Sequence, residues 1–278
     1  MLGLGVSYII PLTKDMRKME TAMNMIQTNP AMNYATIAQT SRHTEKTSER
    51  YSFIPTSRVL TILADYGWHP ASVQEALTRK YAGYQKHIVR LRQQHASGAN
   101  IPEIVIINAH MGSAAFHLLL GIFRFLCLNG LISGETWESF KVRHVGYTDE
   151  MIEAAARALA GAAPKAMDQV RRFEGIELTY AERHAFGQAA VELVNDGEKF
   201  AMRPESLLAP RRVQDTRTDL WTTFNVIQEN TMRGGVRRIN ADGGSARTRA
   251  VKSADQTVKL NQALWTLTEK MAELKLAA

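Results

Sequence analysis

The chain has 278 residues, of which 45% are hydrophobic, so it can form one large domain or two small ones with a sizeable core. Its 34 lysines and arginines against 27 acids give a formal net charge of +7, so the distribution of charge says more about partners than its total. A single cysteine, Cys127, excludes an intrachain disulfide and fits the reducing cytoplasm, where we expect the protein to be located. We expect no secretory signal, because no basic region precedes the apolar patch at the start, and no membrane span, because no stretch reaches ~18 apolar residues.

The first half of the chain is expected to carry most of the strands. Residues 1–48 are polar and rich in methionine, which predicts a loosely ordered arm with one short helix near 13–27. A short strand at 51–55 and a helix at 57–67 follow, and alternating or apolar runs predict strands at 69–78, 84–94 and 103–110. The apolar run at 113–129 ends in Asn-Gly and predicts a buried helix with Cys127 as a core thiol.

The second half is expected to be mostly helical. A strand at 135–146 leads into a long alanine-rich helix capped by Thr148 or Asp149 and kinked at Pro164. A capping box from Thr179 to Glu182 opens the next helix. Helices are also predicted at 215–232 and 253–275, and the last of these is amphipathic.

This order predicts an α+β fold with an antiparallel β-β-β-α core and additional helices, since a parallel fold needs a helix between most strands. We divide the chain into an arm (1–48), a β-rich core (49–146) and a helical part (147–278). The helical part carries a basic loop at 233–252 and is expected to form one continuous domain with the core.

The common catalytic motifs are missing from the sequence, which has no phosphate-binding GxxxxGK[ST], no GxGxxG after a strand and no GxSxG. His110 and His117 are assigned to the end of a strand and the start of a helix, so packing is favoured over a metal pair. We therefore expect no cofactor, no metal and no enzymatic activity. A metal-dependent nuclease stays open, because carboxylates far apart in sequence can be brought together by folding.

A first basic segment spans residues 78–95, and no acid occurs from Ala76 to Pro102. On a strand, alternate cations share one face in steps of ~6.6 Å, close to the phosphate spacing of an extended single strand. Tyrosines between them are expected to stack on bases. The alternative is a hairpin whose outer face is solvated. The candidate residues are Arg79, Lys80, Tyr81, Tyr84, Lys86, Arg90 and Arg92, with Lys141 and Arg143 on a later strand.

A second basic segment, "MRGGVRRINADGGSARTRAVK", spans residues 232–252 and contains one acid, Asp242, and four glycines. Flexible backbone amides and cations of this kind close around a polyanion, which predicts a clamp on a nucleic-acid backbone. A solvated surface loop is the alternative. Membrane binding is disfavoured, since the segment has no aromatic or leucine face. Its candidate residues are Arg233, Arg237, Arg238, Arg247, Arg249 and Lys252.

Four stretches resemble the phage- and plasmid-borne family known as domain of unknown function 932. They are "ERYSFIPTSRVLTILADYGWHP", "KHIVRLR", "IPEIVIINAHMGSAAFHLLLGIFRFLCLNGLISG" and "LWTTFNVIQENTMRGGVRR", with "SARTRAVKS" further on. The resemblance covers about residues 49–275 and implies an origin in a mobile element, but no activity.

The β-β-β-α order expected at 69–129 is also similar, more remotely, to single-strand annealing proteins such as the phage beta and RecT proteins and the eukaryotic Rad-type annealing protein. This similarity implies a homo-oligomeric ring or filament that holds single-stranded DNA in a basic groove without ATP. Strand 84–94 and Arg143 would line the groove, and loop 233–252 would close over it or contact a neighbouring subunit. We therefore expect strand annealing. A DNA-binding regulator or anti-defence protein of the element is the main alternative, and a purely structural role is a further one.

Overall fold

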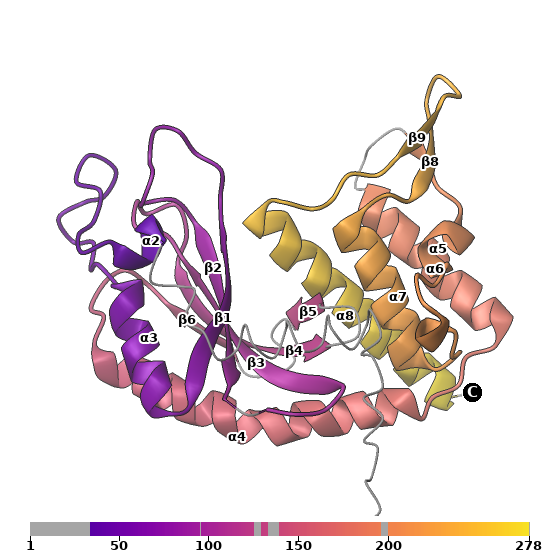
Figure 1. Cartoon of the computed structure of the whole chain (residues 1–278), viewed down its shortest axis with the longest axis horizontal. Helices are drawn as coiled ribbons and strands as arrows, with labels where there is room; N and C mark the ends of the chain where they lie inside the picture. Colours follow the sequence, from indigo (N-terminus) through magenta and orange to yellow (C-terminus); the bar gives the residue numbers. More distant parts are fainter. Residues whose placement is uncertain (1–33, 95, 125–128, 133–138, 196–199, 278) are drawn as a thin grey trace, which may run out of the picture.

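The computed structural model describes residues 34–94, 96–124, 129–132, 139–195 and 200–277. Both the helix expected near 13–27 and Cys127 lie outside these residues. A sheet and a cluster of helices stand side by side on one long helix, α4 (Asp149–Glu174), which runs beneath both (Figure 1). Pro164 lies inside this single helix, and the helix continues to Glu174.

The main sheet has six strands, and every pairing in it is antiparallel. Strands β1 to β4 pair in sequence order, and the short strands β5 and β6 both pair with β4. The predicted antiparallel α+β class is therefore confirmed. The strands are β1 (Trp68–Glu75), β2 (His87–Gln93), β3 (Asn100–Asn108), β4 (Phe116–Arg124), β5 (Asn129–Ile132) and β6 (Ser139–Val142).

The helix expected at 113–129 is wrong, because residues 116–124 form strand β4. Leu118 and Leu120 enter the main core, whereas Leu119 packs with Val105 on the other face of the sheet. A strand buried on both faces is a continuous apolar run, which periodicity does not distinguish from a buried helix. The β-β-β-α order expected at 69–129 is thus absent, since these described residues supply four strands.

The strand expected at 51–55 is also not formed, although the helix after it is present as α3 (Thr56–Asp65). Ser52 donates its amide to the His144 carbonyl at 2.7 Å, and the Ile54 carbonyl accepts from Asn108 Nδ2 at 3.0 Å. These backbone groups are therefore bonded outside a strand ladder. Part of the expected arm is a short helix, α2 (Ala35–Ala38).

The helical half contains α5 (Tyr180–Asn195), α6 (Pro204–Leu208), the 3-10 turn η2 (Val213–Asp215), α7 (Leu220–Arg233) and α8 (Ala254–Ala277). The capping box of α5 is confirmed: Glu182 Oε2 accepts from the Thr179 amide at 2.7 Å, and Thr179 Oγ1 accepts from the Glu182 amide at 3.3 Å. Trp265 of α8 packs against Phe173 of α4 and Phe224 of α7, so one core runs from the sheet into the helices.

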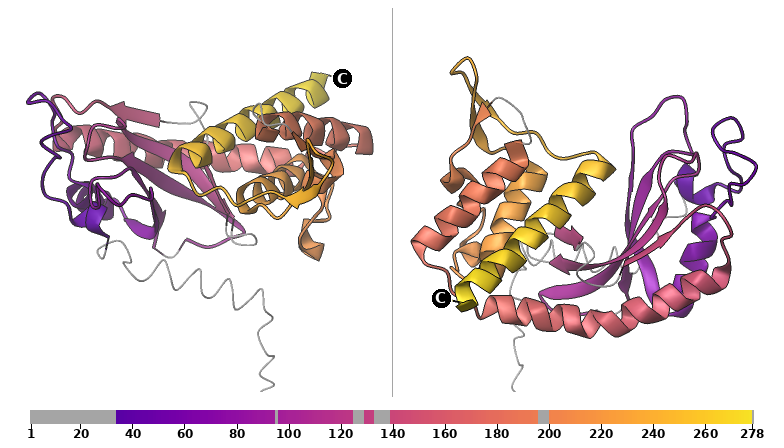
Figure 2. Two further views of the ribbon diagram at one scale, coloured as in Figure 1. Left: turned by 90° about the horizontal axis from the view of Figure 1, so that it is seen from above. Right: turned by 180° about the vertical axis from the view of Figure 1, so that it is seen from behind.

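The basic segment is ordered as a hairpin and not as the flexible loop that its glycines predict. Strands β8 (Arg237–Asn240) and β9 (Ser245–Arg247) pair antiparallel, and β7 (Phe200–Ala201) adds a third strand. The Gly243 amide donates to the Asn240 carbonyl at 2.9 Å and closes the turn. The hairpin projects from the helical half, away from α4 (Figures 1 and 2).

Candidate nucleic-acid interface

The foot of the hairpin is held firmly against the end of α7. Arg211 donates from Nη2 to the Gly234 carbonyl at 2.5 Å and from Nε to Asn230 Oδ1 at 2.7 Å. On the returning strand, the Val251 amide donates to the Met232 carbonyl at 2.9 Å. Both arms of the hairpin therefore leave the helical half in a fixed direction.

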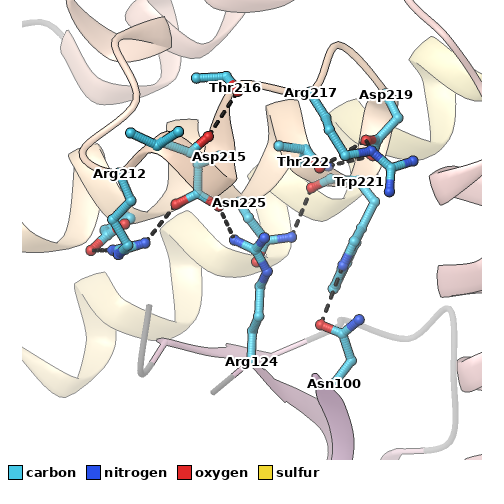
Figure 3. Close-up of polar contacts among 12 residues, drawn as sticks. Asn100, Arg124, Arg212, Asp215, Thr216, Arg217, Asp219, Trp221, Thr222 and Asn225 are labelled. Carbon is cyan, nitrogen blue, oxygen red and sulfur yellow. Dashed lines mark hydrogen bonds and ion pairs between the residues drawn. The ribbon is translucent and has the colours of Figure 1, made fainter. Parts of the chain in front are cut away.

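A buried ionic network supports the helix that carries this foot. Asp215 is 1% exposed and accepts from Arg124 of β4 at 2.8 Å and from Arg212 at 2.6 Å (Figure 3). Arg212 also pairs with Glu229, a buried residue of α7 that takes a further contact from Arg233 at 3.0 Å. Buried charges are tolerated only when they are paired in this way, so the network ties α7 to the sheet.

The N-terminus of α7 is fixed by neutral and ionic contacts. The Asp219 carboxylate accepts from the Thr222 amide at 2.7 Å and caps the helix, and Arg217 pairs with it at 3.0 Å (Figure 3). Trp221 Nε1 donates to Asn100 Oδ1 at 3.3 Å, which joins α7 to the first residue of β3.

On the hairpin, two arginines lie directly opposite one another. Arg237 of β8 pairs in register with Arg247 of β9, and both side chains are exposed. Arg237 Nε donates to Ser245 Oγ at 3.3 Å, and Arg247 Nη1 donates to the Gly235 carbonyl at 2.8 Å. Like charges directly opposite on a strand pair are destabilising, so this arrangement carries an energetic cost in the free protein.

Two further exposed cations of this segment, Arg249 and Lys252, also have no carboxylate partner among the described residues. Within the part of the chain that the structure describes, Arg237, Arg247, Arg249 and Lys252 make no ion pair with a carboxylate. Asp242, the segment's acid, lies at the tip, where Oδ1 accepts from the Gly244 amide at 2.9 Å. The second predicted basic segment thus presents an unneutralised face. Arg238 is half-buried, and Arg233 pairs with Glu229.

The first basic segment behaves differently. Arg90 and Arg92 of β2 do share a face, as predicted, but both pair with Glu103 of β3, which is fully buried. Arg92 is 5% exposed, and its guanidinium carbon lies 3.2 Å from the centre of the Phe123 ring. The expected solvent-facing row is therefore wrong for Arg92, and Glu103 pairs with both arginines and offsets one of their two charges. The strand register brings in an acid from the next strand, which local sequence does not show.

Lys86 is also committed to a contact within the chain. It pairs with Asp255 in the first turn of α8, and Gln74 of β1 donates to the Lys252 carbonyl at 2.9 Å. These contacts join the sheet to the segment that follows the hairpin.

The loop between β1 and β2 carries the remaining residues of the first segment. Arg79 and Lys80 are exposed, and Lys46 and Lys80 lie 5.4 and 5.5 Å from the centre of the Tyr81 ring. The hydrogen bond and charge of Lys46, together with Lys80, lower the pKa of Tyr81. Tyr84 contacts His43 edge-on at 4.9 Å. Both tyrosines therefore already have neighbours on the rings that we expected to stack on bases.

Lys141 and Arg143 lie at the far edge of the sheet. Both are exposed, and Lys141 of β6 pairs in register with His117 of β4. Burial, followed by the charges of Lys141 and Lys86, lowers the pKa of His117. The predicted residues are thus spread over the sheet, the β1–β2 loop, the end of α7 (Arg233), the hairpin and the segment before α8 (Lys252).

The histidines do not suggest a metal centre. No group of three or more His, Cys, Asp or Glu side chains suited to a metal ion occurs among the described residues. His110 is buried: its Nε2 bonds the Thr36 carbonyl at 2.8 Å, and its ring lies 5.1 Å from that of His87. It is a packed core residue, as the sequence favoured.

Reasoning from sequence missed the residues that orient the hairpin. Arg211 and Arg212 lie outside the predicted helices, and Asp215 and Glu229 were assigned to ordinary positions of the helix predicted at 215–232. The signal was the density of polar residues in α7, whose Asn225, Gln228, Glu229 and Asn230 are all buried. A helix that is polar on a buried side must find partners inside the protein.

Comparisons with known proteins bear on identity. A family model described as "Domain of unknown function (DUF932)" matches residues 43–265. The chain belongs to this family. It is 34% identical over 230 residues to the UPF0380 proteins YfjQ and YafZ of Escherichia coli (strain K12), and each match covers 82% of this chain and 84% of the relative. No solved structure matches. The family resemblance expected from the four sequence stretches is confirmed, whereas these names assign no activity. The described helices include none that is long and apolar enough to span a membrane.

Proposed function

We propose that this DUF932 protein binds single-stranded DNA through the arginine hairpin (residues 236–249) and accelerates the pairing of complementary strands. It would act in the cytoplasm as a homo-oligomer, without nucleotide, metal or covalent chemistry. The observation that carries this proposal is the cross-strand pair Arg237 and Arg247, which are exposed, lie opposite one another and have no carboxylate partner among the described residues.

The arginines of the main sheet differ from those of the hairpin, and this difference supports phosphate binding by the hairpin. Where Arg90 and Arg92 share a face of β2, the chain supplies one buried acid, Glu103, that pairs with both. On the hairpin it supplies none among the described residues, and a polyanion would relieve the repulsion. Phosphate groups are the usual ligands of such arginines, and their binding releases counterions.

An exposed apolar residue on the hairpin favours single strands over duplex. Ile239 is 43% exposed and lies two residues from Arg237, so both side chains share one face of β8. Unstacked bases offer flat apolar surface beside the phosphates, whereas a paired duplex hides that surface inside its stack. Pairing of strands would then follow from holding backbones while base edges stay accessible.

The decisive experiment is annealing of two complementary fluorescent oligonucleotides, with a chelator present and nucleotide omitted. Acceleration over the spontaneous rate is expected with the native chain and is expected to be lost in the quadruple variant R237A/R238A/R247A/R249A. Tight binding of the oligonucleotides without faster pairing would refute the annealing activity and leave only the single-strand binding part of the proposal. Absence of binding to any oligonucleotide would refute the whole proposal.

One observation favours a second function, that of a duplex-binding regulator of a mobile element. The hairpin is a two-stranded ribbon, and the major groove of DNA admits such a ribbon. The two functions predict different DNA preferences. At equal salt, a regulator would bind duplex more tightly than either separated strand, whereas an annealing protein would bind the separated strands more tightly.

A further inference from the structure

A hollow of about 440 Å³ lies at the foot of the hairpin, within the range of small-ligand sites. It is bounded by α7, by the segment that follows β9, by the start of α8 and by the chain around Met202. Its lining is of three chemical kinds: apolar, polar and cationic.

Part of the lining is apolar. Val194, Val251 and Leu260 contribute to it, and all three side chains are half-buried. Such aliphatic surface is suited to the flat face of a ring.

Another part of the lining is polar. Thr248 and the exposed Gln256 border the hollow and supply hydrogen-bond donors and acceptors.

The rim is cationic. Arg249 and Arg238 both border the hollow, and Arg249 belongs to the unneutralised set on the hairpin. The rim is also fixed in place, because the Gly235 amide donates to the Thr248 carbonyl and the Thr248 amide donates to the Val236 carbonyl, both at 2.8 Å. The site is therefore formed before any ligand arrives.

From these three features we infer that the hollow at the foot of the hairpin receives one nucleobase of the strand that the hairpin holds. The base face would lie on Val251 and Leu260. Its polar edge would meet Thr248 and Gln256, and its phosphate would meet Arg249. This inference rests on the proposed function and adds to it a pocket for a single nucleoside, which a backbone clamp alone does not require.

The test compares an oligonucleotide of about ten thymidines with a fully abasic strand of the same length, at fixed low salt. We expect the native chain to prefer the base-bearing strand by about tenfold, within the range for one contacted base. Ala250→Leu places a larger side chain in the hollow from an exposed position. We expect it to bring the ratio of base-bearing to abasic affinity close to one, while the affinity for the abasic strand stays unchanged. Ala241→Leu, at the exposed tip of the hairpin, is the matched control and should keep the ratio.

Gln256→Ala provides a second, milder variant, expected to lower only base-bearing affinity by about threefold. A native ratio near one, or a ratio that survives Ala250→Leu, would overturn the pocket while leaving backbone binding intact. Failure to bind either strand would instead overturn the proposed function, and the pocket with it.

Discussion

Arg237 and Arg247 face each other across the hairpin, and the described chain offers neither of them a carboxylate. Each is aimed by a neutral contact, to Ser245 Oγ and to the Gly235 carbonyl, so their charges stay available to solvent. We expect R237A/R247A to weaken single-strand binding and to reduce the slope of log affinity against log salt by about 1.4, or 0.7 for each lost phosphate contact.

Thermal unfolding separates this loss of binding from damage to the fold. Removing two opposed like charges should leave stability unchanged or slightly higher. Lys165→Ala, at an exposed position of α4, removes one surface cation away from the hairpin and should leave the salt slope as it is. An unchanged slope in R237A/R247A would show that these arginines do not touch phosphate.

Glu103 is expected to matter for stability and not for binding. Glu103→Gln leaves Arg92 charged and 5% exposed without its anion, which typically costs about 3–5 kcal/mol. Urea unfolding measures this loss. Glu153→Gln removes an exposed acid 3.8 Å from Arg157 and should cost well under 1 kcal/mol. Equal effects from both changes would contradict the assignment of Glu103 as the buried counter-charge.

Gly234 is expected to be irreplaceable at the foot of the hairpin. Its φ of +65° and ψ of −155° suit glycine alone, and a Cβ there would lie 2.4 Å from the carbonyl carbon of Arg249. Gly234→Ala should cost at least about 1–3 kcal/mol and open the hairpin to limited proteolysis. Gly243→Ala, at φ +81° with open space around the Cβ, is the control and should keep the foot protected. Equal protection in both variants would argue against the close approach.

Acid is expected to destabilise the protein through its buried histidines. Burial lowers the pKa of His87 to about 4, and burial together with the charge of His87 lowers the pKa of His110 to about 4. Because the unfolded chain binds these protons near pH 6.5, stability is fully present above ~6.5 and is lost as the pH falls toward about 4.

Urea unfolding between pH 7 and 4 tests this linkage. The loss attributable to His87 is on the order of 2–3 kcal/mol. His87→Gln should flatten the profile in this range, whereas His184→Gln, at a partly exposed residue beside Glu205, should not. A flat profile in the native chain would contradict the buried neutral state.

Several elements follow from local sequence alone. The capping box of Thr179 and Glu182 forms as predicted, because both partners lie within one turn of each other. The long helix from Asp149 and the alternating strand at 87–93 likewise depend on side chains close in sequence. The composition of residues 232–252 also indicated, without any structure, a segment rich in cations and poor in acids.

Tertiary structure decided what those cations do. In the sequence, Arg90 and Arg92 have no nearby acid, and Arg237 and Arg247 have few. The register of β2 on β3 places Glu103 beside the first pair. The register of β8 on β9 places no acid of the described residues beside the second pair. The same holds for residues 116–124, which became a strand because β3 on one edge and β5 and β6 on the other bond its backbone. Pairing between strands joins residues that are distant in sequence, so local pattern fixes the segments that carry charge, whereas register fixes which charges are neutralised.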